Sequence, residues 1–343
     1  MSSRLFKVGI VGAGHQVSVN HLPELKAMPN IEVSWIADKD LNRARNVGKS
    51  YDVSVCDLSS GLRTFPKTDL VLLAIPFGVR APYYGALSQM GAAVYVEKPF
   101  ARTVTAHRKL CSIFDDYKLA CGLNRRAWGV VQFCKKVLDR DLFGKVRRVR
   151  FGLGTLSGIV VAAHYMADAQ MAGGGMLIET GVHGVDTILY CLDAQAAQLE
   201  DGKVIAENGH DIHCEGVFTV ITSKGEKVPF EIEVSRLKNT INRVEFKFDN
   251  CTVFFSIFGL PQLWVESKDG TLRSLLSDRS NCYPFAWRQV SLEFWQTFIS
   301  GIEQRKANYT SAIDSVLTTQ VIEQLYALAP SSESYDEDNW NNW

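Results

Sequence analysis

The sequence predicts an α/β fold in two parts: a doubly wound parallel sheet, then an α/β domain with an open, mostly antiparallel sheet. Strand and helix patterns alternate up to about Gly122, which is typical of a parallel sheet covered by helices on both faces. Beyond it alternating strands dominate, and turn pairs such as Lys224-Gly225 and Asp269-Gly270 separate several of them. That pattern favours an antiparallel sheet with one solvated face.

The composition excludes several classes of protein. The 343 residues suffice for two domains with sizeable cores, and Lys plus Arg equals Asp plus Glu at 37 each, which gives no reason to expect nucleic acid or an anionic membrane as partner. No secretory hydrophobic segment opens the sequence, and no apolar run approaches a membrane span. The eight cysteines lack paired spacing, so we expect a cytoplasmic protein without a metal site.

A glycine turn joins the first strand to the first helix. The apolar run Lys7–Val11 leads directly into Gly12-Ala13-Gly14, and an amphipathic stretch follows. In this context G-x-G predicts a dinucleotide site, because Gly12 allows the tight turn and Gly14 lets the backbone approach the pyrophosphate at the helix N-terminus. The third glycine of the pattern is replaced by Val17, so the helix and strand sit further apart or Val17 packs between them.

An acidic residue ends the second predicted strand. Glu32–Ala37 is followed by Asp38, 24 positions after Gly14, close to the roughly 20 expected for a carboxylate that binds the ribose 2′-hydroxyl. A carboxylate there repels a 2′-phosphate, which favours NAD over NADP, although Lys39 weakens that preference. The alternative is that Asp38 caps the helix that begins near Leu41.

Two later strands end in residues that could face the same ligand. Leu70–Ala74 ends at Ile75-Pro76, and Ala93–Val96 ends at Glu97-Lys98-Pro99. Ligands of such sheets bind outside the carboxyl ends of the strands, so one crevice could contain these residues together with the glycine turn.

Lys98 is the candidate for chemistry at this edge. A lysine beside the nicotinamide could hydrogen-bond a substrate hydroxyl or tune a general base, and a cis bond to Pro99 would aim it. The alternative is an exposed lysine in a loop.

A second candidate cluster lies in Gly173–Asp186, with the sequence GGGMLIETGVHGVD. Glu179 and His183 are four residues apart on a predicted helix, and Asp186 follows three residues later. A carboxylate beside a histidine fixes its tautomer and raises its basicity, so His183 could take a proton from an alcohol while hydride leaves the carbon. The alternative is an ordinary surface pair on a helix.

These motifs together resemble the glucose–fructose oxidoreductase / inositol dehydrogenase / rhizopine-catabolism (Gfo/Idh/MocA) family of NAD(P)-dependent oxidoreductases. The resemblance rests on Gly12-Ala13-Gly14 followed by His21-Leu22-Pro23, on Asp69-Leu70-Val71 leading to Pro76, on Glu97-Lys98-Pro99, and on Gly173–Asp186. It implies a Rossmann domain, a second domain whose open sheet often mediates oligomerisation, and catalytic roles for Lys98 and His183. The family usually has aspartate where this chain has Glu179.

We therefore expect an NAD(P)-binding Rossmann domain at 1–123, a substrate-binding and oligomerisation domain at 124–330, and an acidic, disordered tail at 331–343. The expected assembly is a homodimer or homotetramer formed through the second sheet.

The expected function is NAD-dependent hydride transfer to or from a secondary carbinol or ketone of a sugar, cyclitol or sugar nucleotide, with NADP as a possible cofactor. One alternative is a glycoside-processing enzyme that uses tightly bound NAD in an internal redox cycle. Another is a non-catalytic sensor of NAD or sugar. Glutamate in place of aspartate at position 179 is compatible with a sensor, whereas the retained Lys98 and His183 argue against it.

The predicted catalytic residues are Lys98, His183 and Glu179. The predicted cofactor contacts are Gly12, Ala13, Gly14, His15, Gln16, Asp38, Ile75, Pro76, Glu97 and Lys98. The predicted substrate contacts are Lys98, Arg126, His164, Tyr165, Glu179 and His183.

Overall fold

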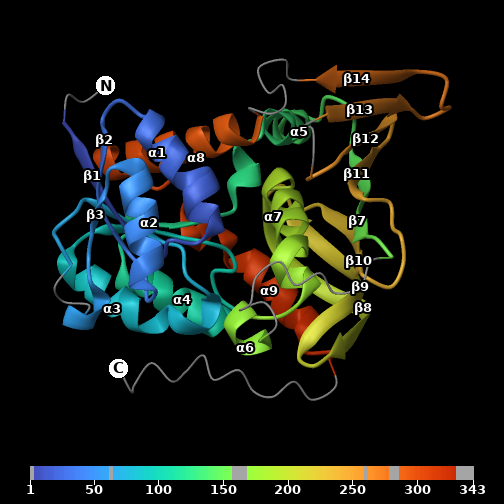
Figure 1. Ribbon diagram of the computed structural model, residues 1–343. Helices are drawn as coiled ribbons and strands as arrows, with labels where there is room; N and C mark the ends of the chain where they lie inside the picture. The colour runs from blue at the N-terminus through green and yellow to red at the C-terminus, as the bar shows by residue number, and fades with distance from the viewer. Residues whose placement is uncertain (1–3, 62–64, 157–167, 259–261, 278–285, 330–343) are drawn as a thin grey trace.

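The computed structural model describes residues 4–61, 65–156, 168–258, 262–277 and 286–329 (Figure 1). His164, Tyr165 and the acidic tail at 331–343 lie outside these residues. Two sheets organise the chain, as the sequence predicts.

The first sheet has six strands in the order β3-β2-β1-β4-β5-β6, and every neighbouring pair is parallel. This is the strand order of the dinucleotide-binding Rossmann fold, whose crevice lies outside the carboxyl ends of the strands where the order reverses, here between β1 and β4. The residues of β4 and β5 are buried throughout, as expected for strands covered on both faces. The strands are β1 (Phe6–Val11), β2 (Ile31–Ala37), β3 (Ser54–Val55), β4 (Leu70–Leu73), β5 (Ala93–Val96) and β6 (Leu119–Cys121).

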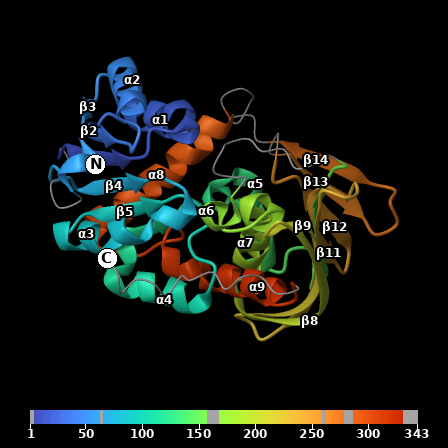
Figure 2. The same cartoon turned by 60° about the horizontal axis from the view of Figure 1, so that its bottom comes forward.

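Helices from both ends of the chain cover this sheet. They are α1 (Leu22–Ala27), α2 (Leu41–Tyr51), α3 (Ala81–Met90), α4 (Val104–Ile113) and α8 (Ala286–Gln304). Figure 2 shows α8 returning from the second half of the chain to lie beside α1, and the two helices are in contact. The division of the chain at residues 123 and 124 stays a prediction.

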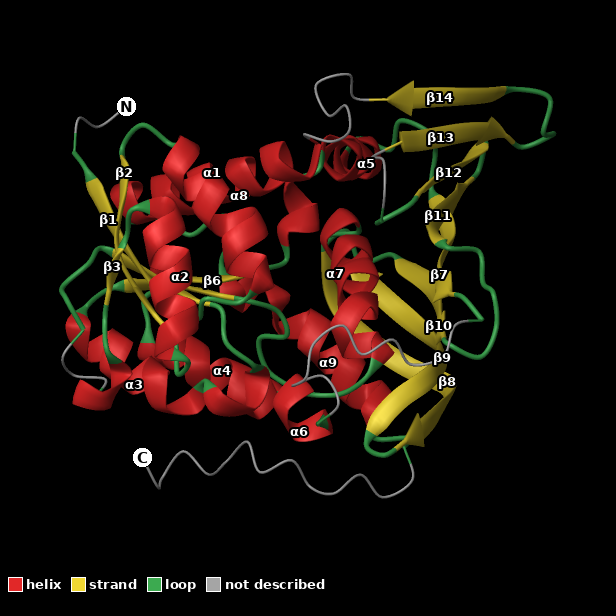
Figure 3. Cartoon of the chain, viewed as in Figure 1, coloured by secondary structure: helices red, strands yellow, loops and turns green. Residues whose placement is uncertain are grey.

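The second sheet has eight strands in the order β14-β13-β12-β11-β7-β10-β9-β8, antiparallel except for the pair β7–β10. Helices α7 (Val182–Cys191) and α9 (Val316–Tyr326) cover one face (Figure 3). A Cβ on Gly184 of α7 would lie 2.3 Å from the ring of Phe151 on β7, so this glycine lets the helix sit directly on the sheet. The strands are β7 (Val146–Gly154), β8 (Ala194–Glu207), β9 (His210–Thr222), β10 (Lys227–Ser235), β11 (Arg243–Phe248), β12 (Cys251–Phe255), β13 (Gln262–Ser267) and β14 (Arg273–Ser277).

Two further helices of the second half are α5 (Gly129–Asp139) and α6 (Ala169–Ala172). Among the described residues, no helix is both long and apolar enough to cross a membrane.

Candidate active site

The glycine turn after β1 has the geometry that its sequence predicts. Gly12 has φ of 106°, and a Cβ there would lie 2.2 Å from the carbonyl oxygen of Ala74, so only glycine fits. A Cβ on Gly14 would meet no atom within 4 Å, which leaves open space over this part of the turn. Val17 is buried, whereas the neighbouring His15 and Gln16 are exposed.

Asp38 links the end of β2 to this turn. One of its carboxylate oxygens accepts the N–H of Ala13 at 2.7 Å and the other accepts the N–H of Asp40 at 2.8 Å. The residue that caps α2 is Asp40, which accepts the N–H groups of Asn42 and Arg43, both at 3.1 Å. The alternative in which Asp38 is the helix cap is therefore wrong. The guanidinium of Arg43 lies 3.9 Å from Asp38.

The loops that follow β4 and β5 are joined by Arg80, which is 4% exposed. Its Nε donates to the carbonyl of Ile75 at 2.9 Å, and its Nη1 donates to the carbonyls of Glu97 at 2.6 Å and Pro99 at 2.5 Å. The Lys98–Pro99 peptide bond is cis. Arg80 therefore fixes the backbone on both sides of Lys98.

The segment before α7 packs against these loops. A Cβ on Gly173 would lie 3.1 Å from the ring of Phe77 and 3.4 Å from Pro99. The buried carboxylate of Asp211, on β9, holds the next residues, because it accepts the N–H groups of Gly175 and Leu177 at 2.7 Å each. Glycine at 173–175 thus brings the start of α7 to the carboxyl end of the first sheet.

Lys98 reaches across to this segment. Its half-buried ammonium donates a hydrogen bond to the backbone carbonyl of Glu179. Burial lowers the pKa of Lys98, against the opposing effect of the Glu97 and Glu179 carboxylates. The pKa of this amine is therefore closer to neutral pH than that of an ordinary lysine, as an acid–base group requires.

His183 lies in the first turn of α7 and is 7% exposed. Burial lowers the pKa of its imidazole well below 6.5, and the positive charges of Arg125 and Lys98 lower it further. Its Nδ1 is buried without a hydrogen-bond partner among the described residues. The ring is therefore neutral at physiological pH and can accept a proton.

The predicted pairing of His183 with a carboxylate is wrong in this structure. The Glu179 carboxylate instead accepts a hydrogen bond from Arg236 at 2.9 Å, and the Asp186 carboxylate accepts hydrogen bonds from Arg126 and Thr318. The reason is local: Leu177–Gly181 forms a π-helical turn, whose wider i→i+5 pattern moves Glu179 out of the i,i+4 relation to His183.

Arg126, predicted to contact substrate, is a structural residue. It is 3% exposed, and it donates to both oxygens of Asp186, at 2.9 and 2.5 Å, and to the carbonyls of Tyr309 and Asp314. Its donors are thus satisfied inside the protein.

The neighbouring Arg125 donates to the carbonyl of Ile257 at 3.3 Å and to Asn124 at 2.7 Å, and its charge acts on the site. Its guanidinium lies over the rings of Trp128 and Phe258, at 5.0 and 5.6 Å. Burial lowers the pKa of Arg125 to about 10, and its charge lowers those of both Lys98 and His183. The sequence contains both arginines side by side, and nothing in it distinguishes which of them forms the buried ion pair with Asp186.

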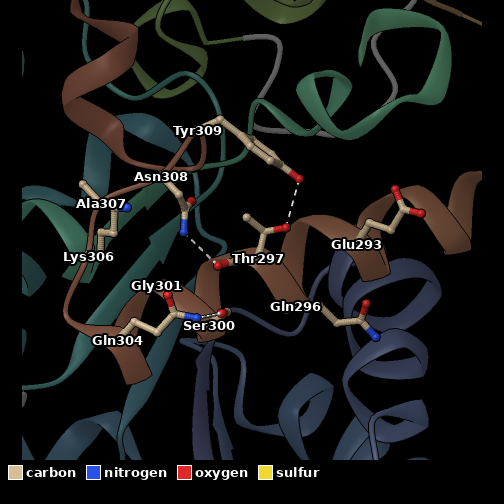
Figure 4. Close-up of a pocket in the computed structure, with 10 residues that line it drawn as sticks. All are labelled: Glu293, Gln296, Thr297, Ser300, Gly301, Gln304, Lys306, Ala307, Asn308 and Tyr309. Atoms are coloured by element: carbon tan, nitrogen blue, oxygen red, sulfur yellow. Dashed lines mark hydrogen bonds between the residues drawn. The ribbon is translucent and has the colours of Figure 1, made fainter. Parts of the chain in front are cut away.

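A separate hollow of about 510 Å³ lies between α8 and the segment 306–309 (Figure 4). Tyr309 and Asn308 hydrogen-bond to Thr297 there, at 3.0 and 2.9 Å. None of the predicted site residues lines it, so it is not the site described above.

The strand order and the glycine turn define a dinucleotide-binding Rossmann domain. Residues 6–124 match the family model described as the oxidoreductase family with an NAD-binding Rossmann fold, GFO_IDH_MocA. This match covers the first part of the chain and agrees with the family resemblance that the sequence motifs indicate.

Two curated relatives share part of the chain. A putative UDP-kanosamine synthase oxidoreductase subunit of Amycolatopsis mediterranei (strain S699) is 27% identical over 197 residues, which cover 57% of this chain and 53% of that protein. The D-glucoside 3-dehydrogenase of Escherichia coli (strain K12) is 23% identical over 217 residues, which cover 62% of each chain. This chain thus spans between half and two thirds of the length of these relatives.

Solved structures match over nearly the whole chain. KijD10, a 3-ketoreductase from Actinomadura kijaniata in complex with NADP and TDP-benzene, has a TM-score of 0.78 at 17% identity and covers 94% of this chain and 98% of its own. GenD2 from gentamicin A biosynthesis, in complex with NAD, has a TM-score of 0.75 at 19% identity, with coverage of 95% and 94%. These likenesses confirm the two-part α/β fold.

Proposed function

We propose that the protein is an NAD-dependent oxidoreductase that transfers hydride to or from a secondary carbinol or ketone of a sugar, cyclitol or sugar nucleotide. The observation that carries the proposal is the position of Lys98 and neutral His183 at the carboxyl end of the Rossmann sheet, the end that also carries the glycine turn. A hydride-transfer site needs a proton acceptor there, beside the nicotinamide.

The residues of the first domain fit NAD. Gly14 leaves room for the pyrophosphate, and Asp38 stands at the end of β2 where the ribose hydroxyls are bound in this fold. When bound, the cofactor supplies the hydride acceptor or donor. In oxidation, His183 accepts the substrate hydroxyl proton at its Nε2, and the ammonium of Lys98 donates a hydrogen bond to the same oxygen; in reduction the proton returns. Glu179 takes a positioning role, since its carbonyl binds Lys98 and its carboxylate binds Arg236.

The substrate class is supported by two observations. The names of the two relatives, a D-glucoside 3-dehydrogenase and a UDP-kanosamine synthase subunit, refer to sugars. Lys98, Arg125 and Arg236 also place positive charge around the segment of Glu179 and His183, which suits a substrate with hydroxyl or phosphate groups. We further propose a homodimer or homotetramer through the open face of the second sheet, on which Val217 and Ile221 of β9 are 41% and 37% exposed.

The proposal is tested by calorimetric titration with NAD(H) and NADP(H), followed by absorbance at 340 nm with a panel of sugars, cyclitols and sugar nucleotides. Formation of NADH with one substrate class supports it. Tight NAD binding without turnover on the whole panel contradicts it and favours an internal redox cycle or a sensor.

Replacing Asp38 by asparagine is expected to raise the ratio of NADP to NAD affinity by about tenfold or more, because removing one charge from beside a 2′-phosphate changes the free energy by about 1.4 kcal/mol or more. Arg43, 3.9 Å from Asp38 and 3.6 Å from Asp40, keeps a positive charge beside the position of that phosphate. Calorimetry measures both affinities, and Asp40→Asn serves as the control because it removes a neighbouring carboxylate that caps α2. An unchanged ratio in Asp38→Asn would contradict the assignment of Asp38.

A further inference from the structure

A partly buried pair of His21 and Glu97 connects the glycine turn to the Lys98 segment. His21 ends the π-helical turn Val17–His21 that follows the glycines, and its Nε2 lies 2.7 Å from Oε1 of Glu97. His21 is 4% exposed. Its ring stands edge-on to the rings of Tyr95, at 5.4 Å, and Trp295, at 5.7 Å, so packing from β5 and α8 fixes its orientation.

The carboxylate of Glu97 is confined on its other side as well. A Cβ on Gly122, just after β6, would lie 3.2 Å from Oε2 of Glu97, so a larger residue at 122 would displace the carboxylate. The cations near Glu97 are His21, Lys98, Arg80 and Arg125. The anion that faces His21 besides Glu97 is Glu24 of α1.

The surroundings favour the charged form of both members of the pair. Burial lowers the pKa of His21, but the hydrogen bond and charge of Glu97, with the charge of Glu24, raise it above 6.5 overall. For Glu97 burial raises the pKa, and the hydrogen bond and charge of His21 with the charges of Lys98 and Arg80 lower it below its usual value. Both shifts thus favour an imidazolium paired with a carboxylate.

We propose that His21 is a positioning residue that holds the Glu97 carboxylate in place, and that the two charges together set the protonation of Lys98 at the candidate active site. The effect on turnover rests on the function proposed above. The arrangement has a direct consequence, because Glu97 attracts the proton of Lys98 while protonated His21 repels it. Glutamine at either position removes the charge but keeps an amide that can hydrogen-bond to the other side chain, so the Glu97 carboxylate stays in place in His21→Gln.

The two substitutions are therefore expected to act in opposite directions. Glu97→Gln removes an attraction and lowers the pKa of Lys98. His21→Gln removes a repulsion and raises the pKa of Lys98. We expect the pKa of Lys98 to shift by at least about half a pH unit in each single variant, and by less in the double variant His21→Gln/Glu97→Gln. A purely structural role would move the pKa of Lys98 in the same direction in both variants, or not at all.

The experiment measures Lys98 without substrate. Lysines of the full chain are methylated with ¹³C-formaldehyde and their resonances are titrated by NMR, with Lys98→Arg to assign the signal and thermal unfolding to verify that each variant folds. Asp40→Asn is the control and should leave the titration unchanged. Opposite shifts support the proposal, and equal or absent shifts overturn it.

The same variants are then assayed for turnover. Where the wild type is active, the basic limb of the pH profile of kcat/KM should move to lower pH in Glu97→Gln and to higher pH in His21→Gln. A wild type that is inactive on the whole substrate panel would contradict the proposed function, whereas the NMR titration would still decide the role of His21. The two failures are therefore distinguishable.

Discussion

Replacing His183 by alanine is expected to lower kcat by about 10²–10⁴-fold, the usual contribution of a general acid–base group. The imidazole is the proton acceptor of the proposed oxidation, and its neutral state is maintained by burial and by the charges of Arg125 and Lys98. Lys98→Ala should cause a comparable loss, because the ammonium is held beside the reacting centre by the carbonyl of Glu179. Stopped-flow or steady-state assays at 340 nm measure both.

The matched control is His213→Ala, which removes a histidine of similar burial, 5% exposed, from β9 of the second sheet. Its kcat should stay within about twofold of the wild type, since a loss of about 10²–10⁴-fold is expected only for acid–base groups at the crevice. Lys98→Arg separates charge from geometry: it keeps a cation but not the ability to titrate. Undiminished turnover in both His183→Ala and Lys98→Ala would refute the assignment of the site.

The acid limb of the pH profile gives an independent check on His183. Protonated His183 cannot accept a proton, so oxidation should stay constant as the pH falls through 6.5 and decline only at more acidic pH, below the depressed pKa. Arg125→Met removes one of the charges that lower this pKa and should move the acid limb to higher pH. A profile of kcat/KM between about pH 4 and pH 8 measures the acid limb. An acid limb at the same pH in Arg125→Met would mean that the charge of Arg125 does not affect the pKa of His183.

Local sequence patterns predicted the first domain well. The apolar strand, Gly12 and the distance to Asp38 depend on backbone constraints within one βαβ unit, so a short stretch of sequence is enough to predict them. The position of Lys98 at the end of β5 was predicted for the same reason, because the ends of parallel strands meet at one edge; its catalytic role stays a prediction.

The misses have physical causes that a short window does not contain. The π-helical turn at Leu177–Gly181 changed the phase of the helix and moved Glu179 from His183 to Arg236. Strand β8 was not predicted, and its register shifts at three places, between Ala194 and Ala196, between Leu199 and Asp201, and between Ile205 and Ala206, so its alternation is interrupted. Asp211 holds the start of α7 from a strand about 30 residues later, a tertiary contact that spacing does not reveal.

The ion pair that fixes α7 offers the largest expected effect on stability. Asp186→Leu should lower the free energy of unfolding by about 3–5 kcal/mol, because it leaves the guanidinium of Arg126 buried without its counter-charge. The two side chains are only 4% and 1% exposed, so water cannot replace the lost partner. Thr318 also loses its acceptor, which lies at 3.0 Å.

The double variant Arg126→Leu/Asp186→Leu should be more stable than Asp186→Leu alone, since replacing both members of a buried pair by apolar groups avoids the unpaired charge. Urea unfolding of the single and double variants measures the coupling. Additive losses would mean that the pair contributes little. A double variant that recovers stability but not kcat would show that the ion pair, through the placement of α7 and His183, is retained for the geometry of the site.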